Sequence, residues 1–272
     1  MIAAGGDVEA VEERSRLHAP SVKPADASGR AATILRHAIV GGDLVDGERL
    51  IAEQIAEEIG ISRPLVMIAM RQLEREGLVR IGGNGRPYVT GLTSRYLADL
   101  YSFRFTLDQA VIPTIAGGVP ADAIAGLDQI MSSMDARAQE GALTAFVELD
   151  MAFHTAFLGL GCNQFLLNAL QSVGDVTFTV LTVTDRLFAL RPHVADVEEE
   201  MMRRARVRAH AQAGLPQVAR GHREILDAVR RGDAGHALDA LRSHYENGED
   251  VLIGQTRDLG LVRVVVDGMN LD

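Results

Sequence analysis

The sequence predicts a mainly α-helical protein, in which three helices and a β-hairpin precede an antiparallel bundle of helices. Apolar residues recur at helical spacing along most of the chain. A strong hairpin signal, Asn84-Gly85, follows the third of these apolar periods. The later periods are separated by short breaks that are rich in glycine and proline, and many helices with short connections favour a bundle.

Composition sets broad limits on the kind of protein. The 272 residues suffice for two domains, and the single cysteine, Cys162, excludes an internal disulfide bond. No apolar run reaches the roughly 18 residues of a membrane helix, and the N-terminus lacks the basic flank and apolar centre of a signal peptide. We therefore expect a cytoplasmic protein without membrane association.

The N-terminal part of the chain has the pattern of a helix-turn-helix. Residues 1–28 lack a sustained apolar period and are predicted to be a disordered tail, followed by a domain over residues 29–92. Gly60 tolerates a left-handed backbone after one helical period, and Ser62 is placed to cap the next helix. In this arrangement the second helix is shaped to enter a DNA major groove.

The hairpin that follows would form a wing, with Asn84-Gly85 as a two-residue turn. A glycine-rich tip allows backbone amides to approach phosphates closely, which makes a purely structural helix pair the weaker alternative. The net charge of −10 disfavours nucleic acid, but residues 29–93 balance eight arginines against eight acids. The predicted DNA contacts are Ser62, Arg63, Met67, Arg71, Arg75, Gly83, Asn84, Gly85 and Arg86.

Residues 93–255 are predicted to form the helical bundle, with residues 256–272 as a C-terminal tail that includes a short apolar run. Residues 176–184 are rich in β-branched side chains, but a lone strand inside a bundle would have no pairing partner, so a helix is predicted there. The expected helices span roughly 95–116, 120–140, 142–160, 164–190, 194–212, 215–231 and 233–253.

Four residues of the bundle have the chemistry of a metal site. Asp150 and His154 are four positions apart and share one helix face, while His222 and His244 lie on two later helices. One carboxylate and three imidazoles suit a divalent ion, with zinc first and nickel, manganese or iron as alternatives. Ordinary core or surface roles for the histidines are the competing interpretation.

Arg104 lies one helical turn from Asp108. It can form an intrahelical ion pair with that residue, or it can bind the carboxylate of a ligand inside the bundle. The pattern alone favours the ion pair.

Two stretches of the chain resemble known families. Residues 32–79 resemble the winged helix of the GntR family of bacterial transcription regulators. The later segments resemble the FCD effector domain of its FadR subfamily, and they read DLYSFRFTLDQA, LDMAFHTAF and GHREILDAVRRGDAGHALDALRSH. Together the resemblance covers about residues 28–255.

The resemblance implies a homodimer on a near-palindromic double-stranded operator and a metal at the Asp150, His154, His222 and His244 positions. It also implies a small organic acid as effector, for which Arg104 is the candidate partner, and it makes fatty acyl-CoA less favoured. Met67 departs from the family pattern, because an arginine is usual at that position of the recognition helix.

The sequence therefore predicts a ligand-responsive transcription regulator, in the first place a repressor, and not an enzyme. A metal-dependent hydrolase or lyase is the alternative of a different class, because an open metal position can activate water. No separate general base is evident near the four residues. A metal sensor, in which the ion itself is the signal, is the third possibility.

Overall fold

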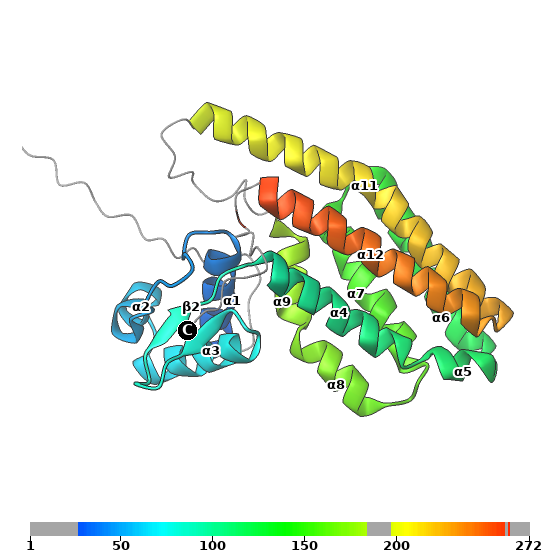
Figure 1. Ribbon diagram of the computed structural model, residues 1–272, viewed down its shortest axis with the longest axis horizontal. Coiled ribbons are helices and arrows are strands. Elements are labelled where there is room, and N and C mark those ends of the chain that lie inside the picture. Colours follow the sequence, from blue (N-terminus) through cyan, green and yellow to red (C-terminus); the bar gives the residue numbers. More distant parts are fainter. Residues whose placement is uncertain (1–26, 184–196, 259–260, 262–272) are drawn as a thin grey trace, which may run out of the picture.

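The computed structural model describes residues 27–183, 197–258 and 261, which form a helical protein with one small antiparallel sheet (Figure 1). The predicted fold class is confirmed. The N-terminal unit contains α1 (Ala27–Val40), α2 (Ala52–Ile59), α3 (Arg63–Arg75), β1 (Val79–Ile81) and β2 (Pro87–Val89). The bundle contains α4 (Ser94–Gln109), α5 (Ile112–Ala116), α6 (Ala121–Glu140), α7 (Leu143–Gly159), α8 (Gln164–Ser172), α9 (Gly174–Leu181), α11 (Val197–Arg231) and α12 (Ala234–Asp258).

The turn between α2 and α3 has the predicted glycine cap but not the predicted serine cap. Gly60 adopts φ 70°, and Ser62 holds the N-cap position of α3 with an extended backbone. Within the described chain, however, the Ser62 side chain makes no capping hydrogen bond. Pro64 has no amide hydrogen, and the Leu65 amide donates to the Ser62 carbonyl, so the usual donors to a capping oxygen are missing or engaged.

The wing forms where it was predicted, but with a longer turn. Val79 pairs with Val89 and Ile81 pairs with Pro87, and the Gly82 amide donates to the Arg86 carbonyl. Gly85 has φ 74°, whereas Asn84 does not adopt a positive φ. The predicted two-residue turn, which needs positive φ at both positions, is therefore wrong, and a three-residue loop with a left-handed glycine takes its place.

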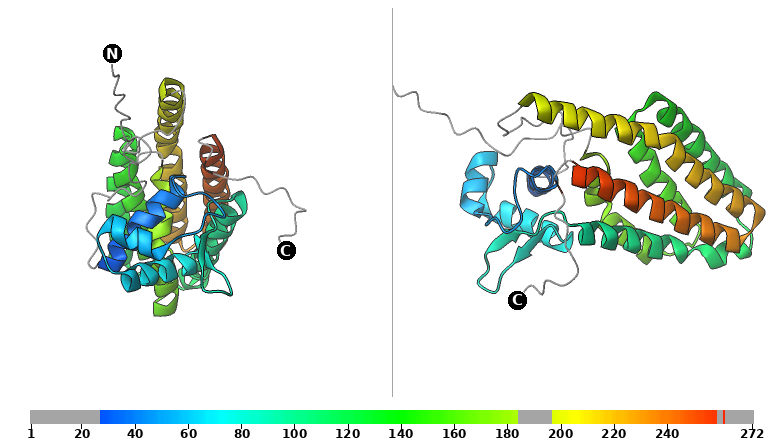
Figure 2. Two further views of the ribbon diagram at one scale, coloured as in Figure 1. Left: turned by 90° about the vertical axis from the view of Figure 1, so that its left-hand side faces the viewer. Right: turned by 45° about the horizontal axis from the view of Figure 1, so that its top comes forward.

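In the bundle, α11 and α12 run side by side, with α6 and α7 against α11 and α4 against α12 (Figures 1 and 2). The β-branched segment is helical over α9, as predicted. Among the described residues no helix is both long and apolar enough to cross a membrane.

Three expected helix boundaries are wrong. Residues 95–116 divide into α4 and α5, because Pro113 offers no amide to continue the first helix. Residues 164–190 divide at Val173, beside the weak helix former Gly174, and the part beyond residue 183 is outside the described residues. The expected break at Gly214-Leu215-Pro216 is absent, since Pro216 lies inside α11, where buried Leu215 and Ala219 hold the helix against the core.

The ends of the chain differ slightly from the expected tails. α1 begins at Ala27, inside the expected tail, and α12 continues to Asp258. Residues 1–26, 259–260 and 262–272 lie outside the described residues. Leu261 packs against the hydrophobic core, and a Cβ at Gly42 would come within 3.2 Å of it.

A buried ion pair within the N-terminal unit also contacts the bundle. Arg36 on α1 donates from Nε and Nη2 to the two carboxylate oxygens of Glu76, at 2.7 Å each. Glu76 caps the C-terminus of α3, and its carbonyl accepts a hydrogen bond from the Tyr96 hydroxyl. Nη2 of Arg36 also lies 3.4 Å from Asp175 at the start of α9. One guanidinium therefore links α1, the end of α3 and α9.

Removing the charge of Glu76 is expected to destabilise the protein, because Glu76→Gln leaves the buried Arg36 guanidinium without its main counter-charge. We expect the free energy of unfolding to fall by about 3–5 kcal/mol in urea denaturation. The control is Asp99→Asn, which removes the exposed Arg95–Asp99 pair and should cost less than about 1 kcal/mol. Equal losses in the two variants would contradict a structural role for the buried pair.

Candidate metal centre

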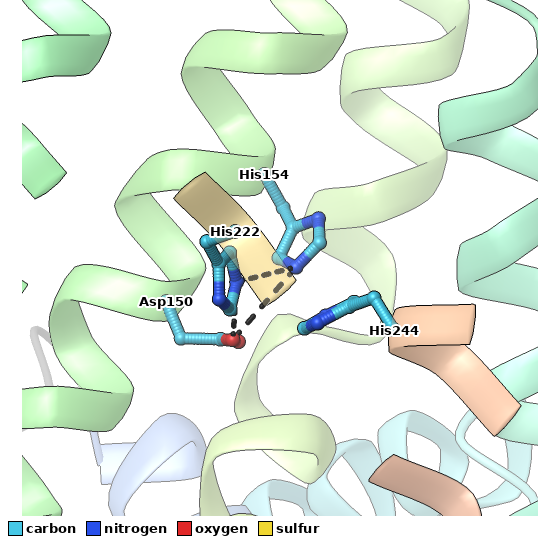
Figure 3. Close-up of side chains that lie close together, drawn as sticks. All are labelled: Asp150, His154, His222 and His244. Carbon is cyan, nitrogen blue, oxygen red and sulfur yellow. Dashed lines mark hydrogen bonds and ion pairs between the residues drawn. The ribbon is translucent and has the colours of Figure 1, made fainter. Parts of the chain in front are cut away.

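The four predicted coordinating residues lie together inside the bundle (Figure 3). Asp150 and His154 project from α7, His222 from α11 and His244 from α12. One potential ligand atom from each residue lies within 4.8 Å of all the others. Asp150, His154 and His222 are buried, and His244 is half-buried. Residues far apart in the sequence thus form one compact group of donors.

The spacing of these donors suits a metal ion. Nε2 of His222 lies 3.0 Å from Asp150 Oδ1, and Nε2 of His154 lies 3.7 Å from the same oxygen. The two Nε2 atoms are 3.3 Å apart. In a tetrahedral zinc site with bonds of about 2.0–2.2 Å, neighbouring donors are roughly 3.3–3.5 Å apart. The cluster can therefore hold an ion without a large rearrangement.

Hydrogen bonds behind the cluster orient two of the imidazoles. Nδ1 of His222 lies 2.9 Å from the Val218 carbonyl, which can only accept, so this nitrogen carries the hydrogen. Nδ1 of His154 lies 2.6 Å from Asp108 Oδ2. When both rings are neutral, both Nε2 lone pairs face Asp150 and each other. Three electron-rich atoms at such short distances favour a cation between them.

The surroundings of His244 and Asp150 shift the pKa values of both side chains. Burial lowers the pKa of His244 well below its usual range, and His222 and His154 lower it further, so this imidazole is neutral. Burial alone raises the pKa of Asp150, but His154, His222 and Arg104 outweigh it and hold this pKa well below its usual range. Asp150 is therefore an ionised carboxylate, and both residues are in the form that binds metal.

Two residues that the sequence did not identify support the site. Asp108 on α4 accepts a hydrogen bond at 2.6 Å from the Tyr245 hydroxyl on α12, through the same oxygen that contacts His154. Burial and the Asp108 carboxylate raise the pKa of Tyr245 well above its usual range, so the hydroxyl remains a donor. Neither residue has a recognisable spacing from the ligands, although Tyr245 directly follows His244.

The Arg104 side chain contacts Asp150 of the candidate metal centre and does not pair with Asp108. Its Nη2 donates to Asp150 Oδ2 at 3.1 Å, so the expected intrahelical pair with Asp108 is replaced by a contact across helices. Arg104 is buried, and its Nε makes no hydrogen bond within the described part of the chain. A cavity of about 170 Å³ adjoins the site and is lined at this end by Arg104, Asp150 and His244. The guanidinium therefore has an unused donor in a buried position beside a cavity.

The predicted DNA contacts lie on the surface, with one exception. Ser62, Arg63, Arg71, Arg75 and the wing tip from Gly83 to Arg86 are exposed. Met67 is half-buried and packs against the core, whereas its neighbour Ile68 is 54% exposed. Arg63 forms an exposed ion pair with Glu53 at 2.5 Å. The exposed face of α3 thus presents Ile68 more fully than the predicted Met67.

Asp108→Asn is expected to weaken metal binding by about 10–100-fold, because His154 then loses the anionic acceptor that orients it and raises its basicity. The affinity is measured by zinc titration against a competing chelator, with circular dichroism to confirm folding. The control is Asp128→Asn, which changes an exposed carboxylate paired with Arg230 on the outside of the bundle. Equal zinc affinity in both variants would exclude Asp108 from supporting the site.

Comparisons with known proteins agree with this architecture. The model of the gntR family of bacterial regulatory proteins matches residues 27–89, and that of the FCD domain matches residues 99–247. The Bacillus subtilis HTH-type transcriptional regulator YdhC is 26% identical over 143 residues, which cover 52% of this chain and 64% of that protein. The gluconate operon transcriptional repressor of Bacillus subtilis is 28% identical over 221 residues, which cover 81% of this chain and 83% of the repressor.

The fold also matches a solved structure. Escherichia coli McbR/YncC superposes with a TM-score of 0.57 at 15% identity, over 85% of this chain and 99% of that one. For YdhC and for the Nta operon transcriptional regulator of Aminobacter aminovorans, the alignment spans less than two thirds of the relative's own length. The two family models nevertheless cover both units of the chain in the expected order. The chain therefore belongs to the GntR family of bacterial regulatory proteins, with an FCD domain as its C-terminal part.

Proposed function

We propose that this protein is a ligand-responsive transcriptional repressor whose bundle binds a divalent metal and a small carboxylate effector. The observation that carries the proposal is the convergence of Asp150, His154, His222 and His244 beside the cavity, in a chain that begins with a gntR winged helix. The gluconate operon relatives are repressors by name, which supports the sign of regulation. Family and relatives are regulators, which supports this function over a hydrolase or lyase.

On the DNA side, α3 enters the major groove of one half-site and the wing lies along the backbone. In this proposal Arg63 at the start of the helix contacts base edges, and Arg71 and Arg75 contact phosphates; the exposure of all three side chains supports these roles. The exposed tip from Gly83 to Arg86 contacts the backbone or the minor groove. A homodimer positions two such winged helices about one helical turn of DNA apart on a near-palindromic operator.

On the ligand side, Asp150 and the three histidines hold the metal, with zinc as the first candidate and nickel, manganese and iron as alternatives. The ion supplies a positive centre to which an effector carboxylate can bind. Arg104 offers its unpaired Nε to the same carboxylate while Nη2 keeps Asp150 in place. Metal retained tightly without any effector would set this role apart from that of a metal sensor.

Arg63→Ala is expected to reduce affinity for an operator obtained by site selection by about 5–150-fold, because one good base contact contributes about 1–3 kcal/mol. Fluorescence anisotropy over a range of salt concentrations measures both the affinity and its salt dependence. The control is Arg95→Ala on α4, which removes another exposed arginine that also pairs with a carboxylate. If affinity and salt dependence are unchanged in Arg63→Ala, this residue lies outside the interface.

A further inference from the structure

The cavity beside the candidate metal centre has two kinds of wall. Its exposed lining residues are mostly polar, and they include Gln217, Glu224, Ser243 and Asn247. Tyr101, which carries a hydroxyl, is also buried in the lining, and the rest of the buried lining beyond the charged end is apolar: Leu143, Phe146, Val147, Ala211, Leu215, Ala240 and Leu252. Burial therefore divides the cavity into a polar mouth and an apolar interior.

The size of the cavity limits the body of a ligand. A cavity of about 150 Å³ lined by apolar side chains is known to accept benzene. The volume here is about 170 Å³, so the interior accommodates one ring or a short branched chain. A hydroxyl group placed against Leu143, Phe146 or Leu215 would lie against hydrocarbon, without a partner on this wall among the described residues. Each such unpaired polar group weakens binding by about fivefold or more.

The polar end of the cavity limits the head of the ligand. Arg104 is a buried guanidinium in the lining, and its Nε makes no hydrogen bond within the described part of the chain. One carboxylate of a ligand can accept from this donor. A second carboxylate on the same small ligand would lie against the apolar interior as a buried charge without a partner.

We propose that the effector is a compact monocarboxylate with an apolar body, either a single aromatic ring or a short branched aliphatic chain. Its carboxylate lies at the Arg104 end, and its body lies against the apolar interior. Polyhydroxylated acids and dicarboxylates are discriminated against. This inference rests on the proposed function, because it specifies the ligand of the same site.

The test uses isothermal titration calorimetry on the full-length, zinc-loaded protein. The probes are benzoate and 3-methylbutanoate for the proposed class, gluconate and succinate for the excluded classes, and benzamide as an uncharged match for benzoate. We expect benzoate or 3-methylbutanoate to bind at least tenfold more tightly than gluconate, succinate and benzamide. Operator binding is measured separately on the same preparation.

Val147→Thr tests the apolar wall, because it introduces a hydroxyl at nearly constant volume. We expect benzoate affinity to fall by about fivefold or more. The control is Val229→Thr, which makes the same change at a buried position on α11 that does not line the cavity. Benzoate affinity in this control should remain at the wild-type value.

Two results would overturn the inference. If gluconate or succinate binds as tightly as the apolar acids, the class is wrong while the proposed effector site stands. If none of the four acids binds while the operator is still bound, both this inference and the effector part of the proposed function fail. Loss of operator binding as well would count against the DNA-binding part.

A second inference concerns the exposed face of α3 and does not depend on the cavity. Ile68 is 54% exposed and lies near Arg71 and Arg75 on this face of the helix. The major groove offers a matching apolar group, the C5-methyl of thymine. The flanking arginines supply the attraction to the DNA backbone. We infer that Ile68 contacts a thymine methyl in each half-site, so it is a specificity-determining residue of the proposed DNA-binding function.

Replacing each operator thymine in turn by deoxyuridine removes one methyl group and leaves base pairing intact. We expect wild-type affinity to fall about fourfold at one position per half-site. Ile68→Ala should lower affinity for the unmodified operator and show no further loss at that position. The control is Val45→Ala, which truncates a side chain of similar exposure, 57%, away from α3.

Additive effects of Ile68→Ala and the deoxyuridine substitutions at every position would overturn the contact, even if the operator is bound normally. A failure of the wild-type protein to select any operator would instead contradict DNA binding itself.

Discussion

The burial of two carboxylates, Asp108 and Asp150, is the constraint on which the bundle depends. A buried charge costs several kcal/mol unless charged or hydrogen-bonding partners surround it. Those partners come from separate helices, since Arg104 belongs to α4, His154 to α7, His222 to α11 and Tyr245 to α12. The contacts of the two carboxylates therefore link the four helices to one another. The interaction that stabilises the centre of the bundle also assembles its candidate metal site.

Local signals in the sequence predicted much of the fold and part of the site. Gly60 marked the end of α2 because its left-handed backbone is a local requirement, and Asp150 and His154 were paired by their spacing on one helix. Pro216 gave a wrong prediction of a helix end, because the packing of α11 outweighs the backbone hydrogen bond that the proline cannot donate. Asp108 and Tyr245 were missed for a related reason. Their roles arise from contacts between α4, α7 and α12, and no spacing within the chain encodes such contacts.

The DNA-binding surface shows the same division between local pattern and tertiary packing. The family pattern led to the prediction that Met67 contacts DNA, but the orientation of α3 on its core partly buries that side chain. The orientation is set by Val66, Ala69, Met70 and Leu73, all of them buried. In the free protein Glu53 pairs with Arg63 at the surface. Exposed pairs of this kind contribute at most about 1 kcal/mol, so DNA can replace Glu53 as the partner of Arg63 at little cost.

α9 touches both the cavity and the N-terminal unit. Leu181 at its end lines the cavity, and Asp175 at its start lies 3.4 Å from Arg36. With eight residues, α9 is only about 12 Å long, so its two ends lie close together. Leu181 and Asp175 therefore connect the cavity to the Arg36 guanidinium, which pairs with Glu76 at the end of the recognition helix. If a ligand of the cavity changes the affinity for the operator, operator DNA changes the affinity for that ligand by the same factor, because thermodynamic coupling is reciprocal.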